Sequence, residues 1–145
     1  MAEVEILTLA NHAEAINGLL YLSGAGWDVV TRAYPEGGLP APHHFGIGVS
    51  VLVPWLEANR RHQLVILIES EDGGAPLMRA EGALEVGRPP GTPEGSDIRA
   101  VLAVDASIQF PAPGGYRLIA QVGPNQRTYP FRVVDQLQAP MRRAS

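Results

Sequence analysis

Four histidines are the residues of this sequence best suited to metal or acid–base chemistry. His43 and His44 are adjacent, so in a strand they would point to opposite faces and could not ligate one ion without a turn. His62 follows two arginines, and His12 stands apart from the others. The chain has no cysteine, which excludes a thiolate site and a cysteine nucleophile. We therefore predict no bound metal and no cofactor.

Carboxylates and serines offer no clearer catalytic pattern. Glu69, Glu71 and Asp72 cluster at a predicted hairpin end, where nothing would desolvate a carboxyl and tune it for acid–base work. Ser23 lies in a glycine-rich stretch, but Tyr21 occupies the position of the first glycine of a nucleophile elbow. A Ser/His/Asp group could still assemble in space. On these residues we expect no catalytic site and predict that the protein is not an enzyme.

Composition narrows the possible partners. The net charge is -4 and all 11 basic residues are arginine, which argues against electrostatic binding of nucleic acid. No apolar run approaches the roughly 20 residues that a membrane span needs. The first residues lack the basic and apolar segments of a secretory signal. We therefore predict a cytoplasmic protein that binds neither nucleic acid nor membrane.

Alternation with a period of two dominates the chain. From Phe45 to Val53, bulky residues alternate with glycine and serine, which predicts a strand with one bulky and one thin face. Residues 98–110 alternate for so long that we expect a bulge near Asp105–Ser107. Residues 63–69 are nearly all apolar, which favours a central strand covered on both faces. The other expected strands are 3–9, 19–23, 27–32, 77–86, 116–122 and 129–134.

Turn residues connect these strands. Asp72-Gly73 and Gly123-Pro124 are typical of hairpins, and the proline-rich residues 88–95 favour a semi-rigid crossover between sheets over a proline-rich ligand for another domain. Residues 11–16 could form one helical turn. The pattern predicts an all-β fold: a two-sheet antiparallel sandwich, immunoglobulin-like or a related Greek key, with about seven to nine strands. We expect one sandwich domain over 1–135 and a C-terminal tail over 136–145.

A short helical turn near residues 54–60 carries the candidate binding site. Pro54 suits the first helical position, and Asn59 could end the turn in the left-handed conformation. A tryptophan beside polar and basic residues at one end of a sandwich is a plausible recognition patch. The predicted binding residues are Trp55, Asn59, Arg60 and His62.

One further expectation concerns a tyrosine. Gly115-Tyr116 after a proline-rich turn resembles the entry to a late strand of immunoglobulin-like sandwiches. In those sandwiches a tyrosine two residues before a core position bonds back to the preceding loop.

Several segments together resemble an uncharacterised, often actinobacterial, bacterial family of small β-sandwich proteins of unknown function. The resemblance covers roughly residues 3–134 and brings no catalytic or binding residue with it. It rests on the segments 7–13, 17–28, 51–64, 69–73, 86–91, 113–116 and 129–133.

Two functions remain open from the sequence. The first is a non-catalytic protein-interaction or assembly module, with a protein partner or self-association into a homo-oligomer through a sheet edge or the Trp55 turn. The alternative is a small-ligand or carbohydrate-binding sandwich, which could include a metal-dependent enzyme using His43, His44 or His62 and needs a pocket with convergent polar groups.

Overall fold

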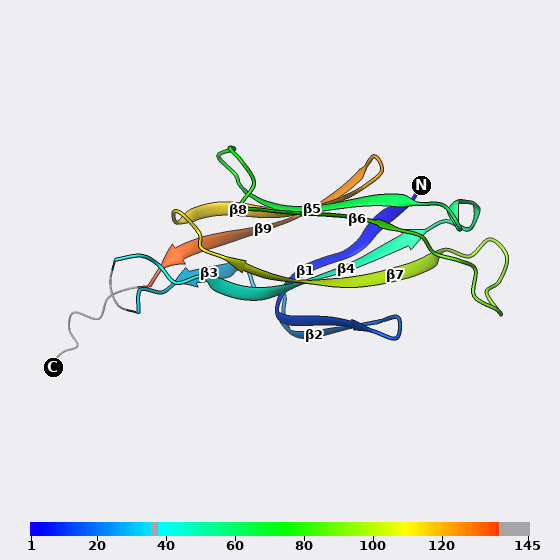
Figure 1. Ribbon diagram of the computed structural model, residues 1–145, viewed down its shortest axis with the longest axis horizontal. Helices are drawn as coiled ribbons and strands as arrows, with labels where there is room; N and C mark the ends of the chain where they lie inside the picture. Colours follow the sequence, from blue (N-terminus) through cyan, green and yellow to red (C-terminus); the bar gives the residue numbers. More distant parts are fainter. Residues whose placement is uncertain (36–37, 137–145) are drawn as a thin grey trace.

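The computed structural model describes residues 1–35 and 38–136, which form two stacked β-sheets (Figure 1). This part of the chain holds nine strands and one 3-10 helix, so the predicted all-β, two-sheet fold class is confirmed. The elements in chain order are β1 (Glu3–Ile16), β2 (Leu19–Ala25), β3 (Val29–Arg32), β4 (His43–Val53), η1 (Trp55–Glu57), β5 (His62–Ser70), β6 (Met78–Leu84), β7 (Ile98–Ile108), β8 (Gly114–Val122) and β9 (Asn125–Asp135).

The two sheets have four and five strands. The four-stranded sheet has the order β2-β1-β4-β7 and the five-stranded sheet has the order β3-β9-β8-β5-β6. All neighbours are antiparallel except β3 and β9, which run parallel. The chain crosses between sheets at η1 and again through the proline-rich segment between β6 and β7, which confirms the predicted crossover.

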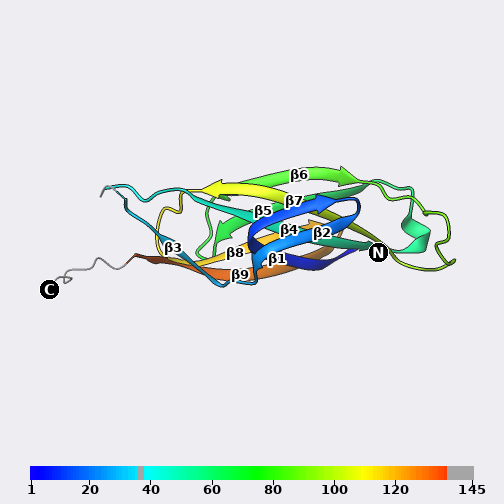
Figure 2. The same cartoon turned by 90° about the horizontal axis from the view of Figure 1, so that it is seen from below.

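The thin face of β4 is covered by a hairpin. On the inner face, Phe45, Ile47, Val49, Val51 and Val53 are buried in the core. On the outer face, β1 leaves β4 at the pair Ala10–Gly46, turns back with β2, and lies across the glycines. Figures 1 and 2 show this β1–β2 hairpin on the outer side of β4, away from β5 and β8. Glycine is present at these positions because the hairpin approaches them closely.

The core contains most of the residues that alternation predicts. Val4, Val49, Val51, Leu64, Ile66, Ile68, Leu118, Phe131 and Val133 are buried. Leu102 and Val104 are only partly buried, because β7 forms an edge of its sheet. The alternation of residues 3–9 also predicts Ile6 in the core, and this prediction is wrong: Ile6 is 41% exposed, because a bulge between Val4 and Ile6 shifts the register of β1 against β4. The extra residue turns Leu7 and Leu9 inward instead.

Three further expectations are wrong. Residues 11–16 continue β1 as a strand, because they pair with β2 across the tight turn Asn17-Gly18, where both residues have positive φ. The ladder between β4 and β7 runs without a register shift, so the bulge expected near Asp105–Ser107 is missing from that ladder. β5 is a central strand, as expected, but the expected cover on both faces is wrong: its burial alternates, because only one face of the five-stranded sheet packs on the core.

The predicted tyrosine contact is present at the start of β8. The Tyr116 hydroxyl donates a hydrogen bond to the Ala112 carbonyl oxygen at 2.7 Å, and the ring is buried. Leu118, two residues further on, is fully buried. The contact fastens the loop after β7 to the core of the opposite sheet.

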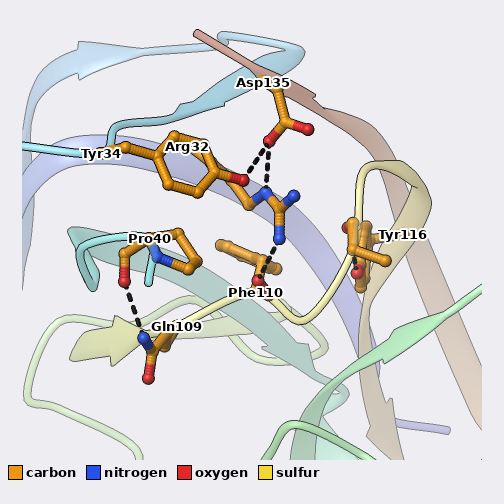
Figure 3. A network of polar contacts seen from close by, with 8 residues as sticks. Arg32, Tyr34, Pro40, Gln109, Phe110, Tyr116 and Asp135 are labelled. Atoms are coloured by element: carbon orange, nitrogen blue, oxygen red, sulfur yellow. Dashed lines mark hydrogen bonds and ion pairs between the residues drawn. The ribbon is translucent and has the colours of Figure 1, made fainter. Parts of the chain in front are cut away.

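A polar network closes the same end of the molecule (Figure 3). The Arg32 side chain, only 10% exposed, donates from Nε to Asp135 Oδ1 at 2.6 Å and from Nη1 to the Phe110 carbonyl at 3.0 Å. The Tyr34 hydroxyl donates to the same Asp135 oxygen at 2.8 Å. The network therefore ties β3, β9 and the loop after β7 together.

This network predicts a loss of stability in acid. The hydrogen bonds from Arg32 and Tyr34 lower the pKa of Asp135 below its ordinary value of 3.8. A lowered folded-state pKa adds stability above the unfolded-state value, and this is lost as the pH falls through the folded-state pKa. We expect Asp135→Asn to lower the denaturation midpoint at pH 7 and to reduce the difference between pH 7 and pH 3. Asp72→Asn, at an exposed turn, should leave both unchanged, and an equal change in the two variants would contradict the prediction.

Two other sequence predictions concern the chain's end and membranes. Gln136 donates its backbone N–H to the Arg32 carbonyl at 3.0 Å, and the rest of the predicted tail, 137–145, lies outside the described residues. Within the described ranges, no helix has the length and apolar character required to cross a membrane.

Candidate functional site

The helical turn that carries the predicted site is shorter than expected. It spans only Trp55–Glu57, directly after Pro54, and Asn59 follows with the predicted left-handed backbone, at a φ of 62°. Glu57 and Arg61 are four residues apart, a spacing that would pair them on a longer helix, but they form no ion pair, because the turn has only three helical residues. The Glu57 carboxylate instead accepts from the Met1 ammonium at 3.1 Å and the Ala2 N–H at 2.9 Å. These contacts, the ammonium first, lower the pKa of Glu57 below 4.5.

The four predicted binding residues have different roles. Asn59 donates its backbone N–H to the Val86 carbonyl at 2.7 Å, and His62 Nε2 lies 3.0 Å from the Glu57 carbonyl oxygen. Both therefore hold the turn in place. Arg60 is exposed, and among the described residues no hydrogen bond to its side chain is present. Trp55 alone of the four lines the hollow beside the turn.

That hollow has a volume of about 560 Å³ and a mixed lining. Its apolar part includes Leu56, whose side chain is 78% exposed. Its acidic part includes Glu94 and Asp97, which form no ion pair within the described part of the chain. The lining residues are Met1, Pro54, Trp55, Leu56, Glu57, Glu94, Gly95 and Asp97. We call this the Trp55 hollow.

Arg88 fixes the tryptophan at this hollow. Its guanidinium lies over the Trp55 ring, 4.1 Å from the ring centroid, and Nη2 donates to the Trp55 carbonyl. Stacking of this kind holds the indole in one orientation. Arg88, Leu56, Glu94 and Asp97 were not predicted as site residues. The sequence signal for Arg88 and Glu94 is the proline-rich segment 88–95, which crosses back beside the turn.

A second hollow lies on the outer face of the four-stranded sheet. Its volume is about 390 Å³, and most of the residues that line it are polar, although its surface is about equally polar and apolar. His44 and Ser107 are opposite each other in the β4–β7 ladder, and Asp105 is two residues from Ser107. No hydrogen bond joins these three side chains in the described structure, so they form no nucleophile–base pair. The lining residues are Asn11, His12, His44, Phe45, Asp105, Ala106 and Ser107.

The histidines do not converge. His43 packs against Trp27 and Phe45, at 5.9 Å between ring centroids in each case, on the opposite face from His44. Burial, and secondarily the neighbouring His44, lowers the pKa of His43 below 6.5. His62 lies beyond the other end of β4, about 30 Å away for a strand of this length. Within the described ranges, no three His, Asp or Glu side chains are grouped to hold a metal ion.

Comparisons with known proteins identify a family but no activity. A model described as "Family of unknown function (DUF6941)" matches residues 5–134. Among solved structures, a beta-glucuronidase from glycoside hydrolase family 2 matches 67% of this chain at 14% identity, with a TM-score of 0.43. The chain spans 10% of that enzyme's length. No curated protein matches.

Proposed function

Because the chain belongs to DUF6941, a family of unknown function, we propose a function from its own surface: it is a non-catalytic protein-interaction module. Its recognition site is the Trp55 hollow, and its ligand is a partner segment with an apolar side chain flanked by arginine or lysine. The observation that carries the proposal is Leu56, an apolar side chain that is 78% exposed at the rim of a hollow.

The chemistry of the lining supports this ligand class. Trp55 is held rigid by Arg88, so binding costs little of its side-chain entropy. Trp and Arg are also the residue types most enriched at interaction hot spots. The unpaired carboxylates of Glu94 and Asp97 beside this apolar surface favour a cationic partner over an acidic one.

The experiment selects displayed peptides on the wild-type protein and measures their affinity for two variants. We expect Leu56→Asp to weaken binding of the selected peptides at least about tenfold, the effect of losing one hot-spot side chain. Leu39→Asp is the matched control, because Leu39 is also 78% exposed but lies in the loop between β3 and β4. The selected peptides should combine basic and apolar residues.

Two results would count against this function. If the selected peptides bound Leu56→Asp as tightly as wild type, the Trp55 hollow would not be the recognition site. If they were predominantly acidic, the carboxylates of the lining would have no part in recognition.

The alternative, a small-ligand binder, is favoured by the polar hollow on the outer face. Asn11, His44, Asp105 and Ser107 converge there from three strands. The site is less suited to binding, because His44, Asp105 and Ser107 are all exposed to solvent and remain hydrated.

The immunoglobulin-like topology and the cytoplasmic location also remain proposals. The Tyr116 contact supports the first, and the absence of cysteine is compatible with the second.

A further inference from the structure

β2 forms one edge of the four-stranded sheet, and its outer side has no partner. It pairs with β1 alone among the described strands. Six of its seven residues are exposed, the exception being the partly buried Leu20. One side of this strand therefore presents backbone N–H and C=O groups that are free to pair with another strand.

The composition of β2 lacks the protection that edge strands normally carry. Its sequence, Leu-Leu-Tyr-Leu-Ser-Gly-Ala, has no charged residue and no proline. Tyr21 is 51% exposed, and Leu19 and Leu22 are exposed beside it. Monomeric proteins usually block such an edge with charge, proline, a bulge or a very short strand.

The other sheet edges of the described structure do carry such protection. β6 has Arg79 and Glu81, joined by an ion pair of 3.0 Å. β7 has Arg99, which is paired with Glu5, and β3 is only four residues long. The uncharged edge is therefore a particular property of β2 and does not follow from the general composition of the strands.

The structure also presents this edge in a fixed conformation. The tight turn at Asn17-Gly18 closes the hairpin. Leu20 and Leu22 pack against the outer face of β4, where a side chain at Gly48 would meet both of them. An ordered edge loses little conformational entropy when another strand adds to it.

The hairpin register determines which residues can bond outward. Ile16 and Leu19 are opposite each other and flank a two-residue turn, so Leu19, Tyr21 and Ser23 direct their backbone groups toward β1. Leu20 and Leu22 direct theirs toward the free edge. A two-fold axis through Tyr21 then pairs Leu20 of one copy with Leu22 of the other, and both pairs use the free groups.

We propose that β2 is a self-association edge, through which two copies of this chain pair antiparallel about Tyr21. The edge is its own complement: the outward-bonding leucines pair with each other, and the two Tyr21 side chains meet across the axis on the exposed face. No like charges face each other across this pairing, because β2 carries none. A two-fold interface of this kind is isologous and closes at the dimer. The site is separate from the Trp55 hollow.

A charged side chain at residue 21 tests whether two copies pair about a two-fold axis through this residue. Wild type should show the mass of a dimer by light scattering after size exclusion. Tyr21→Lys and Tyr21→Glu should each be monomeric, with a dissociation constant raised at least about tenfold, because like charges then meet directly across the axis. An equimolar mixture of the two variants should recover the dimer, because opposite charges now face each other. Leu39→Lys, at an equally solvent-exposed leucine, should remain dimeric.

Several outcomes would overturn this proposal. One is a wild-type protein that stays monomeric up to about 1 mM, the weak end of measurable affinity. A dimer that persists in Tyr21→Lys, or a mixture that stays monomeric, would rule out pairing about Tyr21. Tyr21 makes no side-chain hydrogen bond in the described structure, so both variants should keep the wild-type circular dichroism spectrum. Both Tyr21 variants should bind peptides at the Trp55 hollow as wild type does. A failure of the dimer proposal can therefore be distinguished from a failure of the proposed function.

Discussion

Replacing Phe110 by alanine is expected to remove about 3–5 kcal/mol from the free energy of unfolding, the usual cost of deleting a buried aromatic ring. Phe110 is 1% exposed and follows β7 into the space between the sheets. Its ring contacts Tyr116 and Phe131, at centroid distances of 5.1 and 5.9 Å, in edge-to-face geometry. The substitution removes both contacts and leaves a cavity in the middle of the aromatic cluster.

Chemical denaturation at neutral pH measures this effect. Because the expected loss is a large share of the ~5–15 kcal/mol that a domain has in total, Phe110→Ala could unfold. Phe110→Leu is therefore the second variant, and it should remain folded with a smaller loss. Leu39→Ala, at an exposed position, should change the stability by less than about 0.5 kcal/mol. A Phe110→Ala protein as stable as this control would show that the ring is not in the core.

Adding a single methyl group at Gly46 is expected to be the next most damaging change. A Cβ at this position would lie 2.6 Å from the backbone nitrogen of Ala13, where β1 crosses the outer face of β4. A backbone atom cannot move aside as the end of a side chain can, so the hairpin must shift. We expect Gly46→Ala to destabilise the protein by about 1–3 kcal/mol, as overpacked sites do.

Gly82 provides a matched control. It lies in β6, and a Cβ there would meet nothing within 4 Å. Because alanine restricts the unfolded chain more than glycine does, Gly82→Ala should be neutral or stabilising by up to about 1 kcal/mol. Thermal and denaturant midpoints of the two variants test the comparison directly. Equal effects at the two glycines would mean that the hairpin does not lie on β4.

Much of the fold could be predicted because alternation reports directly on burial. The contrast between Ile47 or Val49 and the neighbouring glycines identified both faces of β4. The Tyr116 contact was predictable too, because its partner lies only four residues away. The burial or contact of a residue can be predicted in this way when its partner is set by the strand period or by a nearby turn.

Features that depend on distant contacts could not be predicted. Ile6 fits the alternation of β1, and nothing in the sequence marks the bulge that turns it outward. Residues 11–16 have weak strand character, and they form a strand because they pair with β2 and pack on the outer face of β4. In both cases tertiary packing overrides the local preference.

In the candidate site, too, residues marked by local signals could be predicted and residues brought in by distant contacts could not. Trp55 and Asn59 were identifiable, because proline before the turn and asparagine after it are local signals. Arg88, Glu94 and Asp97 come from a segment more than thirty residues further along the chain, where the chain crosses back from the five-stranded to the four-stranded sheet. Only the fold brings their charges to the tryptophan.

The parallel pairing of β3 with β9 determines when this protein can complete its fold during synthesis. Val29 pairs with Arg132, and near the other end of the chain Asn125 and Arg127 donate hydrogen bonds to the carbonyls of Ala2 and Val4. Such long loops make folding slow. The β3 strand is therefore synthesised about one hundred residues before β9, with which it pairs. Until β9 emerges, β3 and the first residues of β1 depend on the rest of the sandwich, or on chaperones, to keep their apolar surfaces from other chains.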